Sequence, residues 1–179
     1  PHAAGTKLHE FIGGVAVTRY RYAPEAWERL AYEGGIMANL RRNRWLLLLL
    51  PVFFLAQFLA VLRSLHSLRP DAVHAHWIVP QGIVLASALA FIHVRPRSVC
   101  TAHGSDVSAL RGRVWSSLRL WVAARCDKIV AVSGPLRDRL IAEGCPADKT
   151  GVIPMGVDLA DIFMPEGQVR IANEILFVG

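Results

Sequence analysis

The apolar and polar positions of this chain follow two periods, one typical of strands and one typical of helices. Short runs rich in β-branched residues alternate with longer helical stretches. The strand-like runs are Gly14–Tyr22, Ala72–His76, Arg97–Ala102, Lys128–Val132 and Gly151–Pro154. The helical stretches are Trp45–Arg69, Pro80–His93, Val114–Cys126 and Pro135–Gly144. Pro24–Arg44 predicts a loop with a short helix, and His103–Arg113 predicts a loop. Strands that alternate with helices imply right-handed crossovers. We therefore expect an α/β fold, a Rossmann-like three-layer sandwich with a mostly parallel sheet.

Polar residues follow three of the predicted strands. In parallel sheets of this kind, ligands bind beyond the carboxyl ends of the strands. The residues at these ends are His76-Trp77, His103-Gly104-Ser105-Asp106 and Ser133-Gly134. We expect them to face one crevice. Ser133 also stands where it would cap the following helix, whose N-terminus favours an anion.

The hydrophobic excess of the chain is concentrated in one segment. Of 179 residues 53% are hydrophobic, and the mean hydropathy is +0.35. Trp45–Leu62 contains no charged residue and follows Arg41, Arg42 and Arg44. As a helix these residues measure roughly 27 Å, close to the thickness of the hydrocarbon core. A spanning helix would split the predicted sheet across the membrane. We therefore expect peripheral contact, with the arginines on lipid phosphate; a fully buried core helix is the alternative.

The net charge and the cysteines bear on the partners and on the cellular compartment of the protein. The net charge is +6, but no nucleic-acid-binding motif is present, so we expect no nucleic-acid partner. Cys100, Cys126 and Cys145 have no CxxC spacing and predict reduced, buried thiols. No signal peptide is visible, and the chain starts at Pro1. We expect a cytoplasmic protein, held peripherally at the inner face of the membrane.

Four blocks in order resemble the family 4 retaining glycosyltransferases of the GT-B fold. They are RPDAVHAHW (Arg69–Trp77), TAHGSD (Thr101–Asp106), CDKIVAVSGPLRDRL (Cys126–Leu140) and VIPMGVD (Val152–Asp158). Each block alone is weak, whereas their order and spacing together are specific. The likeness runs from about Gly13 to the end of the chain. One departure is Met155, where many members of the family carry Asn.

The resemblance implies a domain organisation. Residues 1–173 would be the N-terminal, acceptor-side domain without its first strand, which in the family lies beside the strand Ala72–His76. Residues 174–179 would be the first strand of a second domain, which binds most of the sugar nucleotide. The strand Gly14–Tyr22 would then lack its route to the rest of the sheet, and the 179-residue chain alone would be inactive.

The resemblance also implies an activity. The enzyme would move a sugar, as hexosyltransferases do, from a nucleotide-sugar donor to an acceptor glycan or lipid, with retention at the anomeric carbon. The acceptor would be a lipid-linked compound or a cell-surface glycan precursor. No metal or other cofactor is expected. His103 is the expected catalytic residue. The expected substrate-binding residues are His76, Trp77, Gly104, Asp106 and Ser133.

Two other classes of function are consistent with the sequence. His74, His76, His103 and Asp106 would suit a zinc-dependent hydrolase, because imidazoles and a carboxylate are zinc ligands. A non-catalytic module that docks on membranes through Trp45–Leu62 is the other. Asp106 itself has two possible roles, since a carboxylate there can bind a sugar hydroxyl or hold its own loop.

Overall fold

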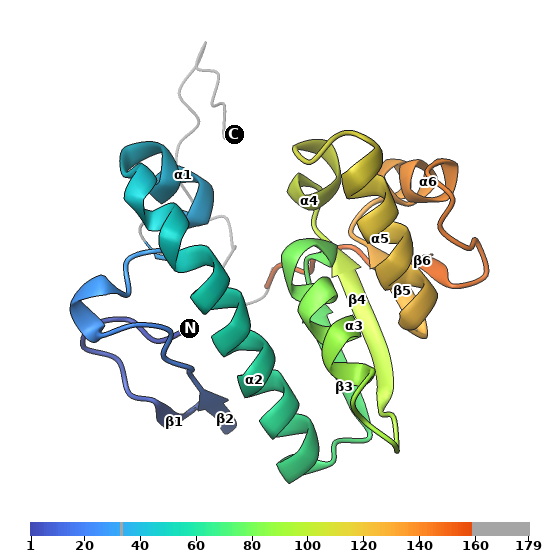
Figure 1. The fold of residues 1–179 in the computed structure, drawn as a ribbon. Helices are drawn as coiled ribbons and strands as arrows, with labels where there is room; N and C mark the ends of the chain where they lie inside the picture. The colour runs from blue at the N-terminus through green and yellow to red at the C-terminus, as the bar shows by residue number, and fades with distance from the viewer. Residues whose placement is uncertain (33, 159–179) are drawn as a thin grey trace, which may run out of the picture.

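The computed structural model describes residues 1–32 and 34–158. The first elements are β1 (His9–Ile12), β2 (Val15–Thr18), η1 (Glu25–Trp27), α1 (Gly35–Arg42), η2 (Arg44–Leu49) and α2 (Leu50–Leu68). They are followed by β3 (Ala72–His76), η3 (Ile78–Gly82), α3 (Ile83–Leu89), β4 (Arg97–Ala102), α4 (Ser105–Ser108), α5 (Arg113–Arg125), β5 (Lys128–Ala131), α6 (Gly134–Ala142) and β6 (Thr150–Val152). The long helix α2 lies between the β1–β2 hairpin and the helix-flanked sheet (Figure 1). The strand predicted over Glu174–Gly179, and with it the predicted domain boundary, lies outside the described residues.

Four strands form one parallel sheet in the order β3-β4-β5-β6. The register places Ala75 beside Cys100, and Cys100 beside Ile129. Each strand is joined to the next by a helical crossover, as expected for right-handed βαβ units. The predicted α/β, Rossmann-like class is confirmed.

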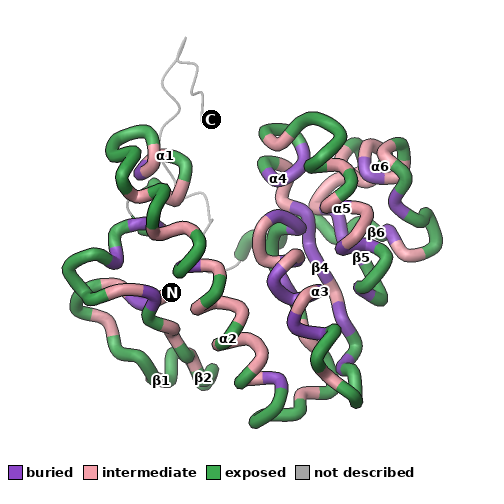
Figure 2. Tube along the Cα trace, viewed as in Figure 1, coloured by how far each residue is buried: buried purple, intermediate pink, exposed green. Residues whose placement is uncertain are grey.

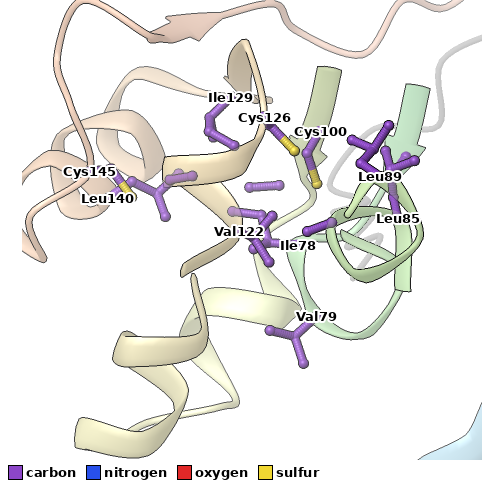
Figure 3. Close-up of a cluster of buried hydrophobic side chains, with 14 of the residues drawn as sticks. Ile78, Val79, Leu85, Leu89, Cys100, Val122, Cys126, Ile129, Leu140 and Cys145 are labelled. Carbon is purple, nitrogen blue, oxygen red and sulfur yellow. The ribbon is translucent and has the colours of Figure 1, made fainter. Parts of the chain in front are cut away.

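The core lies between this sheet and helices α3, α5 and α6. Leu85, Leu89, Val122 and Leu140 pack against the strands that carry Cys100 and Ile129 (Figure 3). All of these side chains are buried. The continuous apolar runs of β4 and β5 therefore reflect strands in the interior of the sheet.

The hairpin β1–β2 departs from the predicted single strand Gly14–Tyr22. Ile12 pairs with Val15, so Gly13 and Gly14 form a two-residue turn. Both glycines have positive φ, 56° and 81°, which the primed turns of tight hairpins require. Gly-Gly between two strand-like runs is itself a hairpin signal. The prediction missed β1 because His9–Ile12 contains two polar residues among four.

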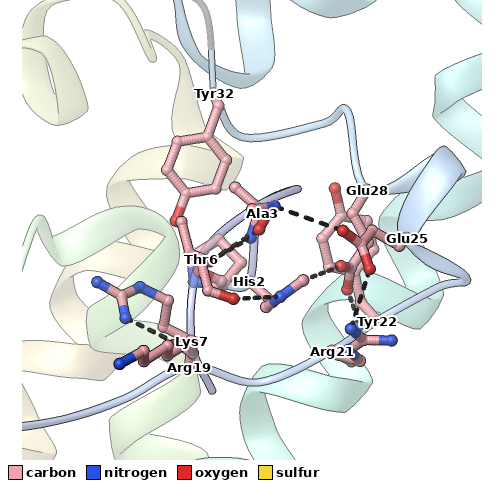
Figure 4. A network of polar contacts seen from close by, with 12 residues as sticks. His2, Ala3, Thr6, Lys7, Arg19, Arg21, Tyr22, Glu25, Glu28 and Tyr32 are labelled. Carbon is pink, nitrogen blue, oxygen red and sulfur yellow. Dashed lines mark hydrogen bonds and ion pairs between the residues drawn. The ribbon is translucent and has the colours of Figure 1, made fainter. Parts of the chain in front are cut away.

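A polar network fixes the first residues of the chain onto residues 20–32 (Figure 4). The buried His2 ring contacts the Glu28 carboxylate, with 2.5 Å between Nδ1 and Oε2. The other Glu28 oxygen accepts a hydrogen bond from the backbone N–H of Tyr22 at 3.1 Å. Tyr22, Leu30 and Phe53 form a second apolar cluster. This cluster joins α2 to the N-terminal segment.

Proline marks the start of two predicted helical segments. The predicted helix Trp45–Arg69 is divided into η2 and α2, and Pro51 stands in the first turn of α2, where its missing N–H costs nothing. The helix predicted from Pro80 is confirmed at its start: Val79 is the one residue of η3 with non-helical backbone angles, and the helical segment continues through Gly82 into α3.

Gly82 packs so closely against the sheet that an added Cβ would lie 2.8 Å from the Cys100 sulfur and 3.0 Å from a Val122 methyl carbon. Both neighbours are fully buried and cannot move aside. Gly82 already has helical backbone angles, so alanine gains about 1 kcal/mol from backbone entropy. The overpacking costs about 1–3 kcal/mol and outweighs that gain. We expect Gly82→Ala to lower the free energy of unfolding, measured by chemical denaturation.

The matched control for this substitution is Gly134→Ala in the first turn of α6, where an added Cβ meets no atom within 4 Å. That variant should be neutral or slightly stabilised. If both substitutions had the same effect, packing at Gly82 would not be the cause.

Candidate functional site

Two histidines from adjacent strands meet at the carboxyl end of the sheet. His76 is the last residue of β3, and His103 directly follows β4. The His76 Nδ1 and His103 Nε2 atoms lie 2.9 Å apart, a hydrogen bond between the two rings. The Trp77 ring lies beside His103, with 5.1 Å between ring centroids. The structure therefore brings together His76, Trp77 and His103, as the strand pattern predicted.

Trp77 holds this position at a conformational cost. Its φ is 67°, a region that bulky residues rarely adopt. Its backbone N–H donates to Thr101 O at 2.8 Å, and its backbone oxygen accepts from Gly82 N at 2.9 Å. These two hydrogen bonds hold the unusual backbone and leave the ring exposed beside the histidines. Strained backbone at such a place is a marker of a functional site.

Asp106 is a positioning residue in this structure. Its carboxylate is buried, and Oδ2 accepts from Ile78 N at 2.7 Å. Oδ1 accepts from the backbone N–H groups of His103 and Gly104, at 3.1 and 3.0 Å. One side chain thus ties the loop after β3 to the loop after β4. Of the two roles considered for Asp106, the geometry supports the loop-holding one; direct contact with a sugar stays a prediction.

Arg119 holds the same loop through hydrogen bonds to its backbone. The sequence analysis did not predict this role. Its guanidinium is buried in α5 and forms an ion pair with Glu143, just after α6. Its Nη1 atom donates to the backbone oxygens of Leu110 and Asp106, at 2.9 and 3.3 Å. Arg119 therefore connects two helices to the segment that carries His103.

Gly104 and Ser133 complete the predicted set. Gly104 has φ 104°, and an added Cβ there would meet open space, so a ligand has room to approach. Ser133 occupies the N-cap position of α6, but its side chain makes no capping hydrogen bond. The predicted capping role is therefore wrong, because the hydroxyl does not reach the N–H groups of the first turn. Its role in substrate binding stays a prediction.

His74 lies two residues before His76 on the same face of β3, with 4.3 Å between the ring centroids. Its Nε2 atom lies 2.7 Å from the Thr101 hydroxyl. Within residues 1–32 and 34–158, no three side chains of the metal-binding types are arranged to hold a metal ion. The carboxylate of Asp106 already accepts three backbone hydrogen bonds. The four-residue set of the zinc alternative is thus not assembled.

The pKa of His76 lies below its ordinary value of 6.5. Partial desolvation of the ring is the main cause, and the nearby His74 and His103 add to it. The neutral ring is therefore favoured, and it can donate or accept toward His103. If both rings were protonated, both facing nitrogens would be donors and the hydrogen bond would be lost.

We expect a histidine NMR titration to place the pKa of His76 below 6.5, and His74→Ala to raise it by removing one positive neighbour. The folded state binds this proton more weakly than the unfolded state. Stability should therefore fall as the pH drops from 6.5 through the lowered pKa, and should not change on this account above 6.5. An unshifted His76 in the wild-type protein would contradict the geometry.

A groove of about 550 Å³ adjoins the histidines. It lies between β2, α2 and β3 and is lined by His74, His76 and Trp77 among others. Three buried polar atoms that find no hydrogen-bond partner among the described residues belong to its lining residues: Tyr20 Oη, Gln57 Oε1 and Gln81 Oε1. Such groups are costly to leave unpaired, so the groove is suited to a polar occupant.

The three cysteines lie away from this chemistry. Cys100, Cys126 and Cys145 are free and buried, as predicted. Burial raises the pKa of the Cys126 and Cys145 thiols to about 11. They are therefore structural thiols and not nucleophiles.

The parallel sheet, its helical crossovers and the polar cluster at its carboxyl ends define a Rossmann-like α/β domain. The family model of glycosyltransferase family 4 matches residues 13–161, most of the chain. This chain belongs to that family. No curated protein matches it.

Proposed function

We propose that this domain serves a retaining glycosyltransferase of the hexosyl type, which moves a sugar from a nucleotide-sugar donor to an acceptor. The observation that carries the proposal is the cluster of His76, Trp77 and His103 at the ends of two adjacent strands, in a chain of this family. Strand ends of this kind are where such sheets bind ligands.

His103 is the residue that we assign to the transferred sugar. Its ring is held by His76 on one side and by Trp77 on the other, and its backbone N–H is held by Asp106. A ring fixed in this way can hydrogen-bond a sugar hydroxyl without first being ordered, which lowers the entropy cost of reaching the transition state. His76 and Trp77 shape the acceptor side, and Gly104 and Ser133 border the substrate.

The chemistry that we propose needs positioning and charge stabilisation from the protein, not a protein nucleophile. The leaving phosphate of the donor would help to deprotonate the acceptor on the same face of the sugar. Hydrogen bonds from the imidazole rings would stabilise the charge that develops. We propose that no metal takes part. The free, buried cysteines fit a reducing, cytoplasmic setting.

The test is an assay of the full-length protein against a panel of nucleotide sugars, with EDTA present. Consumption of one donor, with a product that keeps the anomeric configuration by NMR, would support the proposal and identify the donor. No turnover with any donor, together with bound zinc by elemental analysis, would contradict it and favour a hydrolase.

A further inference from the structure

One side of the η2–α2 helix leaves a row of large apolar side chains in solvent. This apolar stripe consists of Trp45, Leu48, Val52, Leu55 and Leu59, all of them exposed. Spacings of three and four residues place them on one side of a helix. Trp45, Leu48 and Leu55 are 78%, 70% and 57% exposed. The stripe is about 16 Å long from Leu48 to Leu59, at 1.5 Å per residue.

The other sides of the same helix are packed against the domain. Phe53 is buried against Tyr22, with 4.9 Å between ring centroids. Leu65, near the other end, belongs to the main core, and Phe58 contacts Phe91. Figure 2 shows α2 with buried points on a largely intermediate and exposed surface. The helix is therefore fixed to the domain along its length, with the stripe facing away.

Length and composition alone would allow this helix to cross a bilayer. The most apolar 18-residue window of the helix Arg44–Leu68 has a mean hydropathy of 2.5, and 6% of that window is buried. However, Phe53 and Leu65 anchor both ends in the same domain. The arrangement fits a helix that lies in the membrane interface and does not span it.

Positive charge is concentrated around the stripe. Residues 34–70 contain five arginines and no Asp or Glu, so this fifth of the chain carries +5 of the net +6. The arginines are Arg41, Arg42, Arg44, Arg63 and Arg69. Arg41, Arg42 and Arg44 are exposed at one end of the stripe, and Arg63 continues its face at the other. In the described part of the chain, none of these five forms an ion pair with an acidic side chain.

We propose that the apolar stripe and its arginines dock the protein on an anionic membrane surface. The stripe enters the boundary between headgroups and acyl chains, and Arg41, Arg42 and Arg44 contact lipid phosphates. A second copy of this chain is the less favourable occupant, because a symmetric contact would place two surfaces of the same positive sign together. The inference does not depend on sugar transfer, so its failure would leave the proposed activity untouched.

The experiment is co-sedimentation of the purified full-length protein with vesicles of phosphatidylcholine and phosphatidylglycerol, compared with vesicles of phosphatidylcholine alone. We expect strong binding to the anionic vesicles that weakens in high salt. Arg41→Gln/Arg42→Gln/Arg44→Gln should lower the affinity about 100-fold. The control Arg95→Gln/Arg113→Gln/Arg125→Gln removes the same charge from exposed arginines outside the segment and should bind almost as the wild type does.

A second measurement tests the orientation. Brominated phospholipids should quench part of the tryptophan fluorescence, and Trp45→Phe should remove most of that quenching. Leu48→Gln/Leu55→Gln should weaken binding, whereas Val94→Gln/Val114→Gln, at exposed apolar positions elsewhere, should not. Circular dichroism confirms that each variant is folded.

Three outcomes would overturn the proposal: equal loss of binding in the charge variant and its control, no quenching of Trp45, or equal binding to both kinds of vesicle. A dimer in analytical ultracentrifugation that Leu48→Gln/Leu55→Gln dissociates would also overturn it and assign the stripe to a second copy.

Discussion

Replacing His103 by Ala in the full-length protein is expected to lower turnover about 100- to 1,000-fold, the loss typical of removing one preorganised hydrogen-bonding group at a transition state. The free energy of unfolding should change by less than about 1 kcal/mol, because the ring is half-buried and its hydrogen bond and stacking contact within the described residues are with the exposed side chains of His76 and Trp77. Steady-state kinetics with the donor identified in the panel would measure the first, and chemical denaturation the second.

His93→Ala is the matched control for this prediction, since His93 is an exposed histidine that follows α3 and lies outside the polar cluster. It should keep full turnover. Wild-type turnover in His103→Ala would remove His103 from the reaction and with it the central assignment of the site.

Arg119→Met is expected to destabilise the fold by about 3 kcal/mol or more. The substitution removes the buried partner of Glu143 and the donors to Asp106 O and Leu110 O. The cost is large because the fully buried Arg119 leaves a gap in its packing and because the backbone oxygens of Asp106 and Leu110 lose their donor, although Glu143 keeps Arg139. Chemical denaturation would measure the loss, and hydrogen exchange should show the loop after β4 opening more readily.

The control on the same helix is Arg125→Met. Arg125 is exposed, and its guanidinium lies 4.1 Å from the centre of the Trp121 ring. Such an exposed contact contributes about 0.5–1 kcal/mol. If the two methionine variants lost equal stability, the buried pair with Glu143 would have no special role.

The strands of the sheet could be predicted from local pattern. The predicted bounds of β3 and β4 agree with the structure residue for residue, because short apolar runs between turn signals have few other solutions. The hairpin was missed, although Gly13-Gly14 carries its signal, because the polar residues of β1 obscure the alternation. The helix predicted from Pro80 starts there, directly after the extended residue Val79.

Of the site, the sequence predicted those residues that lie directly at the ends of strands. His76 and His103 were expected together because they end neighbouring strands, and the 2.9 Å contact confirms that they meet. No local feature of the sequence shows whether Asp106 binds a substrate or holds its own loop. Its three backbone donors come from two loops. Arg119 and Glu143 are 24 residues apart in the sequence, so their pairing could not be predicted from a local hydrophobic pattern. Burial of a charge becomes visible only when the fold is known.

The position of the His76 backbone depends on how the strand β3 is paired in the sheet. β3 is hydrogen-bonded to β4 alone among the described strands. Because backbone groups alternate between the two edges of a strand, Ala72, His74 and His76 direct their N–H and C=O groups toward the groove. A segment that paired along this edge would hydrogen-bond the backbone of His76 from its second side and so hold the end of the strand that carries the ring.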